Sequence, residues 1–257
     1  MENKKPQSEL SIGEILTQTF NLYSRNFVQY LIPFLVAGIL TGLVTIVVRS
    51  AIVIPTAPVH PTSQQLLAWF PTFLTATVTT VFLSGIVSWI TNSVTMGITI
   101  KSTSDMLESG QANLQKSFNF TIAKIISLLA VSLITGILIV LGLIALIIPG
   151  LILALMFSLV YPAIMLENTS ILESLSRSRV LVSNRWLKTL GLLLLFGIIV
   201  AVVIGVVEVI TGPFGLVSPI ISGILSAFIA PISAIAITLY YYSMKARTAP
   251  LQQSQTF

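Results

Sequence analysis

The stretch from Ile125 to Leu166 contains no charged residue, and no other feature of the sequence constrains the fold as strongly. A helix crosses the hydrocarbon core of a bilayer with about 20 apolar residues, so this stretch is about twice as long as one span. Its only strong helix breaker near the middle is the dipeptide Pro149-Gly150. The stretch therefore predicts a hairpin of two transmembrane helices with a short turn at Pro149-Gly150.

The composition extends this interpretation to the whole chain. Hydrophobic residues make up 55% of the sequence and charged residues 8%, whereas an ordinary globular protein has about 25% charged residues. Because a soluble core cannot hide such an apolar fraction, most of the chain must face lipid. We predict an all-α fold, a polytopic membrane helical bundle with six transmembrane helices plus interfacial amphipathic helices. The predicted spans are about 28–48, 71–100, 125–147, 150–166, 187–210 and 216–244.

Three parts of the chain differ in character. Residues 1–26 form an N-terminal amphipathic segment, residues 27–247 the membrane domain, and residues 248–257 a tail that we expect to be disordered. Ser11 and Glu14 have the spacing of a capping box, which predicts a helix start, and Ser170 and Glu173 repeat it. The first of these helices either lies in the membrane interface or caps the bundle as a soluble helix, and the two interpretations are equally favoured.

Two further patterns concern packing at the helix surfaces. Gly38 and Gly42 have the GxxxG spacing that lets another helix approach closely, and ordinary packing is a commoner reason for it than dimerisation. Tyr240, Tyr241 and Tyr242 precede Lys245 and Arg247, which is the order expected for an aromatic belt followed by basic anchors at a membrane interface.

The basic residues predict the orientation of the chain. With six spans, the termini and the loops after spans 2 and 4 lie on one side of the membrane. Every lysine and arginine except Arg49 falls on that side. Because basic residues concentrate on the cytoplasmic side, we expect a plasma-membrane protein with both termini in the cytoplasm.

The helix between spans 4 and 5 carries the candidate contact residues for anionic lipids or partner proteins. These are Arg177, Arg179, Arg185 and Lys188. A cation near a membrane surface contributes about 1 kcal/mol to binding of anionic lipid, but the same residues can serve only to set the topology, and we favour that simpler role. Arg179 falls on the apolar side of this helix, where it either extends to the headgroups or pairs with Glu167 inside the bundle.

Polar residues in the spans suggest two further sites. Arg49 and Glu208 lie at the far ends of spans 1 and 5, where they form an ion pair or remain two separate interfacial charges. Span 2 carries hydroxyl residues at helical spacing, which line a polar path or only bond within and between helices. Packing is the commoner explanation for such a stripe. Its members are Thr77, Thr80, Ser84, Ser88, Thr91 and Thr95.

The sequence resembles the membrane domain that is fused to some glycerophosphodiester phosphodiesterases and also occurs as free-standing prokaryotic membrane proteins. The resemblance covers nearly the whole chain but its motifs are loose and mostly structural. It implies the helical membrane fold and no activity, because the phosphodiesterase reaction belongs to a separate soluble barrel. The residues that carry it are the run SIGEILTQTFNLYSRNF, Ile148-Pro149-Gly150, Pro162, Glu167, Glu173-Ser174-Leu175, Arg177-Ser178 and Arg185-Trp186.

These observations argue against an enzyme. One histidine and eight carboxylates, with no cysteine, form no metal cluster, nucleophile triad or phosphate-binding glycine loop. We expect no cofactor, no metal and no nucleic acid, but membrane lipids and candidate membrane-protein partners. The first hypothesis is a non-catalytic membrane protein that organises partners or lipids through the basic helix between spans 4 and 5. The alternative is a small permease or exporter that uses the hydroxyl face of span 2.

Overall fold

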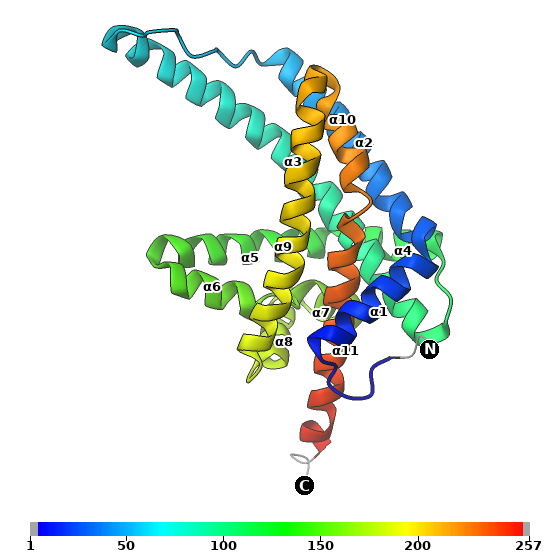
Figure 1. Cartoon of the computed structure of the whole chain (residues 1–257). Coiled ribbons are helices and arrows are strands. Elements are labelled where there is room, and N and C mark those ends of the chain that lie inside the picture. The colour runs from blue at the N-terminus through cyan, green and yellow to red at the C-terminus, as the bar shows by residue number, and fades with distance from the viewer. Residues whose placement is uncertain (1–4, 254–257) are drawn as a thin grey trace.

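A computed structural model describes residues 5–253 of the chain, and all regular structure in this range is helical (Figure 1). The bounds of the helices follow in chain order. They are α1 (Ile12–Arg25), α2 (Phe27–Ala51), α3 (Ser63–Ser109), α4 (Leu114–Ala123), α5 (Ile125–Ala145), α6 (Ile147–Met156), α7 (Val160–Leu166), α8 (Ile171–Val182), α9 (Trp186–Thr211), the 3-10 helix η1 (Gly212–Val217), α10 (Ser218–Ser226) and α11 (Ala230–Gln253).

Both predicted capping boxes are confirmed. The Ser11 hydroxyl accepts from the Glu14 amide, and the Glu14 carboxylate accepts from the Ser11 amide at the start of α1. Ser170 and Glu173 make the same reciprocal pair at the start of α8. Each pair satisfies backbone donors that lack partners inside the first turn, so these two starts follow from local sequence alone.

Helix α3 is much longer than the predicted span 71–100. Its 47 residues extend about 70 Å at about 1.5 Å per residue, more than twice the hydrocarbon core of a bilayer of about 30 Å. Its first half diverges from the bundle, and the irregular segment 52–62 connects it to α2 (Figure 1). Pro55, Pro58 and Pro61 lie in this segment, where they stop helix propagation.

The predicted turn at Pro149-Gly150 is wrong. The chain reverses at Leu146, whose backbone is extended, and both residues lie in the first turns of α6. Proline is tolerated there because its missing N–H has no partner in a first turn. Gly150 packs against Leu143 and Gly142 of α5, so its missing side chain serves the contact between the two helices.

The predicted span 150–166 is also interrupted. Residues 157–159 separate α6 from α7. The Ser178 hydroxyl of α8 donates to the Met156 carbonyl oxygen at 2.6 Å and accepts from the Leu159 amide at 3.1 Å. One hydroxyl therefore satisfies backbone groups that the break frees. In Figure 1 the α5 and α6 pair projects to the side of α9 and α11.

Helix α11 occupies the centre of the polar end of the bundle, and the predicted aromatic belt is wrong. Tyr240, Tyr241 and Tyr242 are all buried. Consecutive helical residues point about 100° apart, so three buried neighbours require other segments around α11 on several sides. The Tyr240 hydroxyl forms a hydrogen bond with Thr189 of α9, and the Tyr241 hydroxyl with Glu167 at the end of α7. The Tyr242 hydroxyl forms one with Ser104 of α3. The helix continues through Gln253, so it includes the start of the predicted tail 248–257, and residues 254–257 lie outside the described range.

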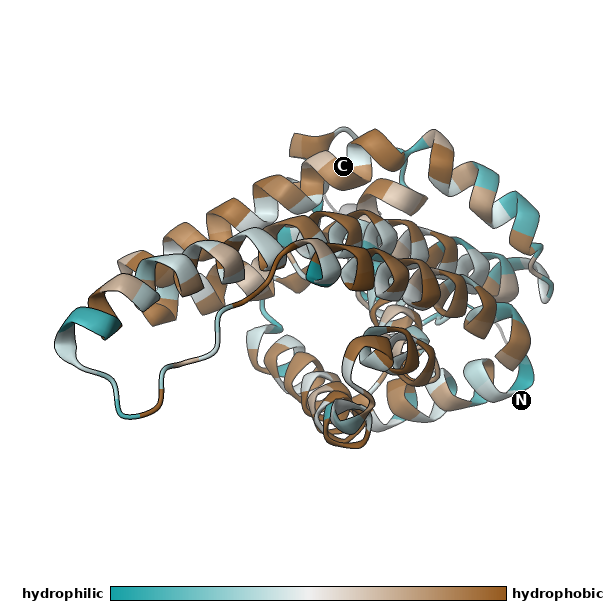
Figure 2. Cartoon of the chain, turned by 90° about the horizontal axis from the view of Figure 1, so that it is seen from above, coloured by the Kyte–Doolittle hydropathy of each residue, from teal (hydrophilic) through white to brown (hydrophobic). Residues whose placement is uncertain are grey.

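Several helices are long and apolar enough to cross a membrane, which identifies an all-helical, multi-pass membrane protein. Figure 2 shows apolar residues along most of the long helices. Many large apolar side chains are exposed, as lipid-facing surfaces require, and Leu187 is 84% exposed. By length and composition the described residues contain five such segments, the last of which joins α9 to α11. They are Phe27–Ala51, Ser63–Ser109, Ile125–Ala145, Ile147–Leu166 and Trp186–Thr248.

Candidate functional site: a polar cavity and the charged end of the bundle

Carboxylates hold three of the four predicted contact cations of the α8 to α9 region. Glu9 accepts from Arg185 Nε at 2.8 Å and from Lys188 Nζ at 2.6 Å, which ties the segment before α1 to the start of α9. These hydrogen bonds, with the Arg185 contact the largest influence, outweigh burial and lower the pKa of Glu9 to about 2. Glu9 therefore remains ionised at neutral pH, and two of the four predicted lipid-contact cations have an internal partner.

Glu167 joins three elements at the same end of the molecule. Its carboxylate accepts two hydrogen bonds from Arg177, at 2.7 Å and 3.0 Å, and one from the Tyr241 hydroxyl at 2.7 Å. Lys245 Nζ is 3.1 Å away. Burial acts to raise the pKa of Glu167, but the hydrogen bonds from Arg177, Tyr241 and Lys245 more than offset it, so the net pKa lies below its ordinary value.

The predicted ion pair between Glu167 and Arg179 is wrong. Residues two apart on a helix point in nearly opposite directions, so only one of Arg177 and Arg179 can face Glu167. Ser174 and Ser178 are buried, and they set the rotation of α8 that turns Arg177 inward. Arg179 is exposed, and among residues 5–253 it has no carboxylate partner. Of the four predicted contact cations, Arg179 alone lacks a carboxylate partner within this range.

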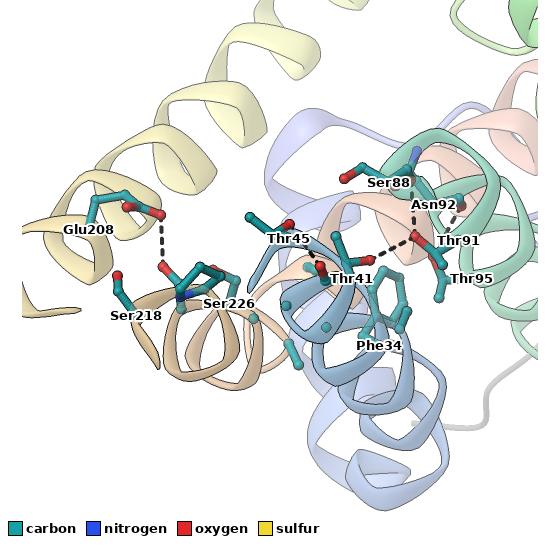
Figure 3. A pocket seen from close by; sticks show the side chains of 18 of the residues that line it. Phe34, Thr41, Thr45, Ser88, Thr91, Asn92, Thr95, Glu208, Ser218 and Ser226 are labelled. Atoms are coloured by element: carbon teal, nitrogen blue, oxygen red, sulfur yellow. Dashed lines mark hydrogen bonds between the residues drawn. The ribbon is translucent and has the colours of Figure 1, made fainter. Parts of the chain in front are cut away.

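A polar cavity of about 400 Å³ lies at the opposite part of the bundle, between α2, α3, α9 and α10. Figure 3 shows Glu208 of α9 on one side of it and Ser88, Asn92 and Thr95 of α3 on the other, with Thr41 and Thr45 of α2 between them. Hydroxyls of α10 complete the lining at Ser218, Ser222 and Ser226. Four helices thus converge on one hydroxyl-lined space that is open to the surface of an apolar protein.

The glycines of α2 build one wall of this cavity. A side chain at Gly38 would meet the backbone of Gly223 in α10, and a side chain at Gly42 would lie 2.7 Å from the Ile220 Cα. The GxxxG pair therefore packs against α10 of the same chain, and this contact accounts for the spacing without a second copy. Close approach of the two backbones brings the α10 serines beside the α2 threonines.

Half of the eight hydroxyls in the lining donate back to their own helices. Ser88 donates to the Ser84 carbonyl at 2.9 Å, Thr91 to the Val87 carbonyl at 2.9 Å, and Thr45 to the Thr41 carbonyl at 2.8 Å. A hydroxyl whose proton is used in this way still has lone pairs that accept hydrogen bonds. The cavity wall is therefore richer in acceptors than in donors, which suits a ligand that carries N–H or O–H groups.

Arg49 and Glu208 both line the cavity but do not form an ion pair, so the predicted pairing is not found among the described residues. Glu208 instead accepts from the Ser222 hydroxyl at 2.7 Å. Both side chains are exposed and lie near the ends of α2 and α9 at the same end of the molecule (Figure 1). The cavity consequently has one positive and one negative group available to a ligand.

Only half of the predicted hydroxyl stripe reaches the cavity. Ser88, Thr91 and Thr95 line it, whereas Thr77, Thr80 and Ser84 do not. Thr80 donates to the carbonyl of its own helix at Ala76, and within the described chain the buried hydroxyls of Thr77 and Ser84 have no partner. The structure therefore divides the stripe into a cavity part and a part outside the cavity.

Sequence reasoning missed the contributions of other helices to the cavity. Thr41 and Thr45 are spaced i, i+4 in α2, and Ser218, Ser222 and Ser226 recur every fourth residue in α10. These spacings are visible in the sequence, but they do not show which faces meet. Asn92 was overlooked because an amide next to a hydroxyl stripe has no periodic signal of its own.

The described residues contain no group of His, Asp or Glu side chains that could hold a metal ion. A scan of protein-family models finds no match to this chain, and comparisons with curated proteins and with solved structures find no similar protein. The cavity and the charged end of the bundle are therefore the features from which a function can be inferred.

Proposed function

We propose that this protein is a non-catalytic membrane protein that binds a small polar group in the cavity and passes it through the membrane, as a permease or exporter does. The single observation that carries this proposal is the convergence of hydroxyls from α2, α3 and α10 on one space of about 400 Å³. Transporters place such polar groups between helices because lipid cannot solvate the substrate. The acceptor-rich lining favours a substrate with amine or hydroxyl donors.

Ethanolamine flux into proteoliposomes tests this proposal. A variant with Ser88→Val and Asn92→Leu is expected to lower the flux by about tenfold, the effect of one lost hydrogen bond to a charged substrate. Both side chains are exposed toward the cavity, so the changes need not disturb the buried core. The matched control is Thr77→Val with Thr80→Val, which alters the same helix outside the cavity. Equal loss in both variants, or wild-type flux no greater than in protein-free liposomes, contradicts the proposal.

The topology that we propose has six spans with both termini in the cytoplasm of a plasma-membrane protein. Because the chain has no cysteine, single cysteines report their own location. We expect a membrane-impermeant maleimide to label Thr56→Cys and Leu146→Cys in intact cells, whereas Gln111→Cys reacts only after lysis. Leu146 is the most informative position, because it lies at the turn between α5 and α6, and these two helices project to the side of α9 (Figure 1). Labelling of Thr56→Cys alone from outside means that this hairpin does not cross the membrane.

Organisation of lipids or partner proteins by α8 is a second candidate function. One observation favours it: Arg179 is exposed and shares a face of α8 with Leu172, seven residues earlier, which is 75% exposed. A basic and apolar face of this kind suits an anionic membrane surface. Unchanged recovery of anionic lipid and crosslinked partners after Arg179→Gln removes this candidate. The resemblance to the phosphodiesterase membrane domain stays a prediction that agrees with a non-catalytic role.

A further inference from the structure

An apolar groove borders the polar cavity along α2 and α3. Its volume is about 530 Å³, and α4 closes its other side. Val36 and Leu40 of α2, Val94 of α3 and Phe118 of α4 are among its apolar lining residues. Val36 is 61% exposed and Phe118 42% exposed, so the groove presents unpartnered apolar surface.

The cavity and the groove share a boundary. Ala37, Thr91 and Thr95 line both spaces. At this boundary the hydroxyls of Thr41 and Thr91 form a hydrogen bond of 3.2 Å. A polar space and an apolar space that share a wall fit one amphiphilic molecule better than two unrelated ligands. The polar part of such a molecule finds hydrogen-bond partners in the cavity, and its apolar part contacts the groove.

The groove lies within the reach of one acyl chain from Arg49 along α2. The groove residues of α2 extend from Ile32 to Leu40, and Arg49 lies nine to 17 residues further along the same helix. At about 1.5 Å per residue this separation is about 14 to 26 Å. Half of a bilayer with its headgroups is about 20 Å thick. A lipid whose headgroup lies beside Arg49 can therefore reach the groove with its acyl chain, which then points toward α4 on the cytoplasmic side of the proposed topology.

The charges of the cavity select the type of headgroup. Arg49 supplies a guanidinium, which binds phosphate oxygens well, and Glu208 supplies a carboxylate, which pairs with an ammonium. The acceptor oxygens of Ser88, Thr91 and Thr45 offer further partners to ammonium protons. A headgroup with phosphate but no amine leaves Glu208 without a cation, and a headgroup with neither leaves both charges unmatched.

From these observations we infer that the cavity and the groove together bind one zwitterionic aminophospholipid, with its phosphate and amine between Arg49 and Glu208 and one acyl chain against Val36, Val94 and Phe118. This inference rests on the proposed function and names its substrate class. The cavity then recognises the headgroup, and the groove holds the part of the molecule that stays in lipid.

Native mass spectrometry of the full chain tests this inference. The protein is extracted from vesicles with equal amounts of phosphatidylethanolamine and phosphatidylglycerol. The wild type is expected to retain phosphatidylethanolamine preferentially, and Glu208→Gln is expected to reduce that preference about tenfold, as the loss of one charge-assisted hydrogen bond predicts. Val36→Trp and Val94→Trp are expected to reduce retention of the lipid by filling the groove.

The controls separate this inference from the proposed function. Val78→Trp places the same bulk on α3 at an exposed residue that lines neither space. Equal retention of the two lipids, or retention unchanged by both groove variants, overturns the inference. Ethanolamine flux that persists while no aminophospholipid is retained also overturns it and leaves the proposed function intact. Absence of both flux and lipid overturns both proposals.

Discussion

A Gly38→Leu variant is expected to force α2 and α10 apart and to lower the free energy of unfolding by about 3 kcal/mol, the upper part of the range for overpacking a close contact. A side chain at position 38 meets the Gly223 backbone, which cannot move aside as a flexible side chain can. The loss can be measured by titrating the purified protein with sodium dodecyl sulfate in mixed micelles. Since α10 and α2 also form a wall of the cavity, ethanolamine flux should fall with it.

Gly85→Ala is the matched control for this variant. Gly85 lies inside α3, and nothing is near a side-chain carbon added there. Alanine in a helix interior stabilises by about 0.5–1 kcal/mol relative to glycine. If Gly38→Leu leaves the unfolding transition unchanged but abolishes a dimer, the GxxxG pair serves contact between two copies and the packing against α10 is not the contact that matters.

Removal of the Glu167 carboxylate is expected to produce the other large loss. Glu167→Ala leaves Arg177, Lys245 and the Tyr241 hydroxyl without their shared acceptor at the meeting of α7, α8 and α11. Breaking a buried ion pair by removal of one partner costs about 3–5 kcal/mol, and we expect about 3 kcal/mol because the Glu167 side chain is 14% exposed. Unfolding in mixed micelles measures this loss, and trypsin should cleave near Arg177 sooner.

Two arginines of α8 supply the control for this prediction. Arg177→Ala should destabilise the protein because it removes two hydrogen bonds from Glu167, whereas Arg179→Ala should change the free energy of unfolding by less than about 0.5 kcal/mol. A larger loss for Arg179→Ala than for Arg177→Ala means that α8 is rotated, with Arg179 and not Arg177 facing Glu167.

The orientation of these two arginines depends on contacts that local sequence does not determine. Apolar periodicity placed Arg179 on the apolar side of α8, but the buried side of this helix is formed by Ser174 and Ser178 together with Leu181 and Val182. Ser178 faces inward because its hydroxyl satisfies the broken backbone between α6 and α7, and Ser174 is buried one turn earlier. A break that depends on a partner helix leaves no periodic signal, so the rotation of α8 could not be predicted.

The residues that line the cavity likewise depend partly on local sequence and partly on tertiary packing. Helical spacing correctly places Ser88, Thr91 and Thr95 on one stripe of α3, because the stripe depends only on the geometry of one helix. Which part of that stripe is used depends on where α2 and α10 cross it. Gly38 similarly indicates that a helix approaches closely, while the identity of that helix follows from the path of the whole chain.

Sequence by itself determined the helical membrane class, two helix starts and the side of the bundle on which most charges gather. These depend on composition, on spacing within one helix and on caps of three residues. Only the tertiary structure decided that Glu9 and Glu167 hold the basic residues, that the three tyrosines are internal, and that Arg49 and Glu208 share a cavity. The physical reason is that these contacts join residues far apart in the chain, whose meeting depends on the rotation and crossing of packed helices rather than on local preference.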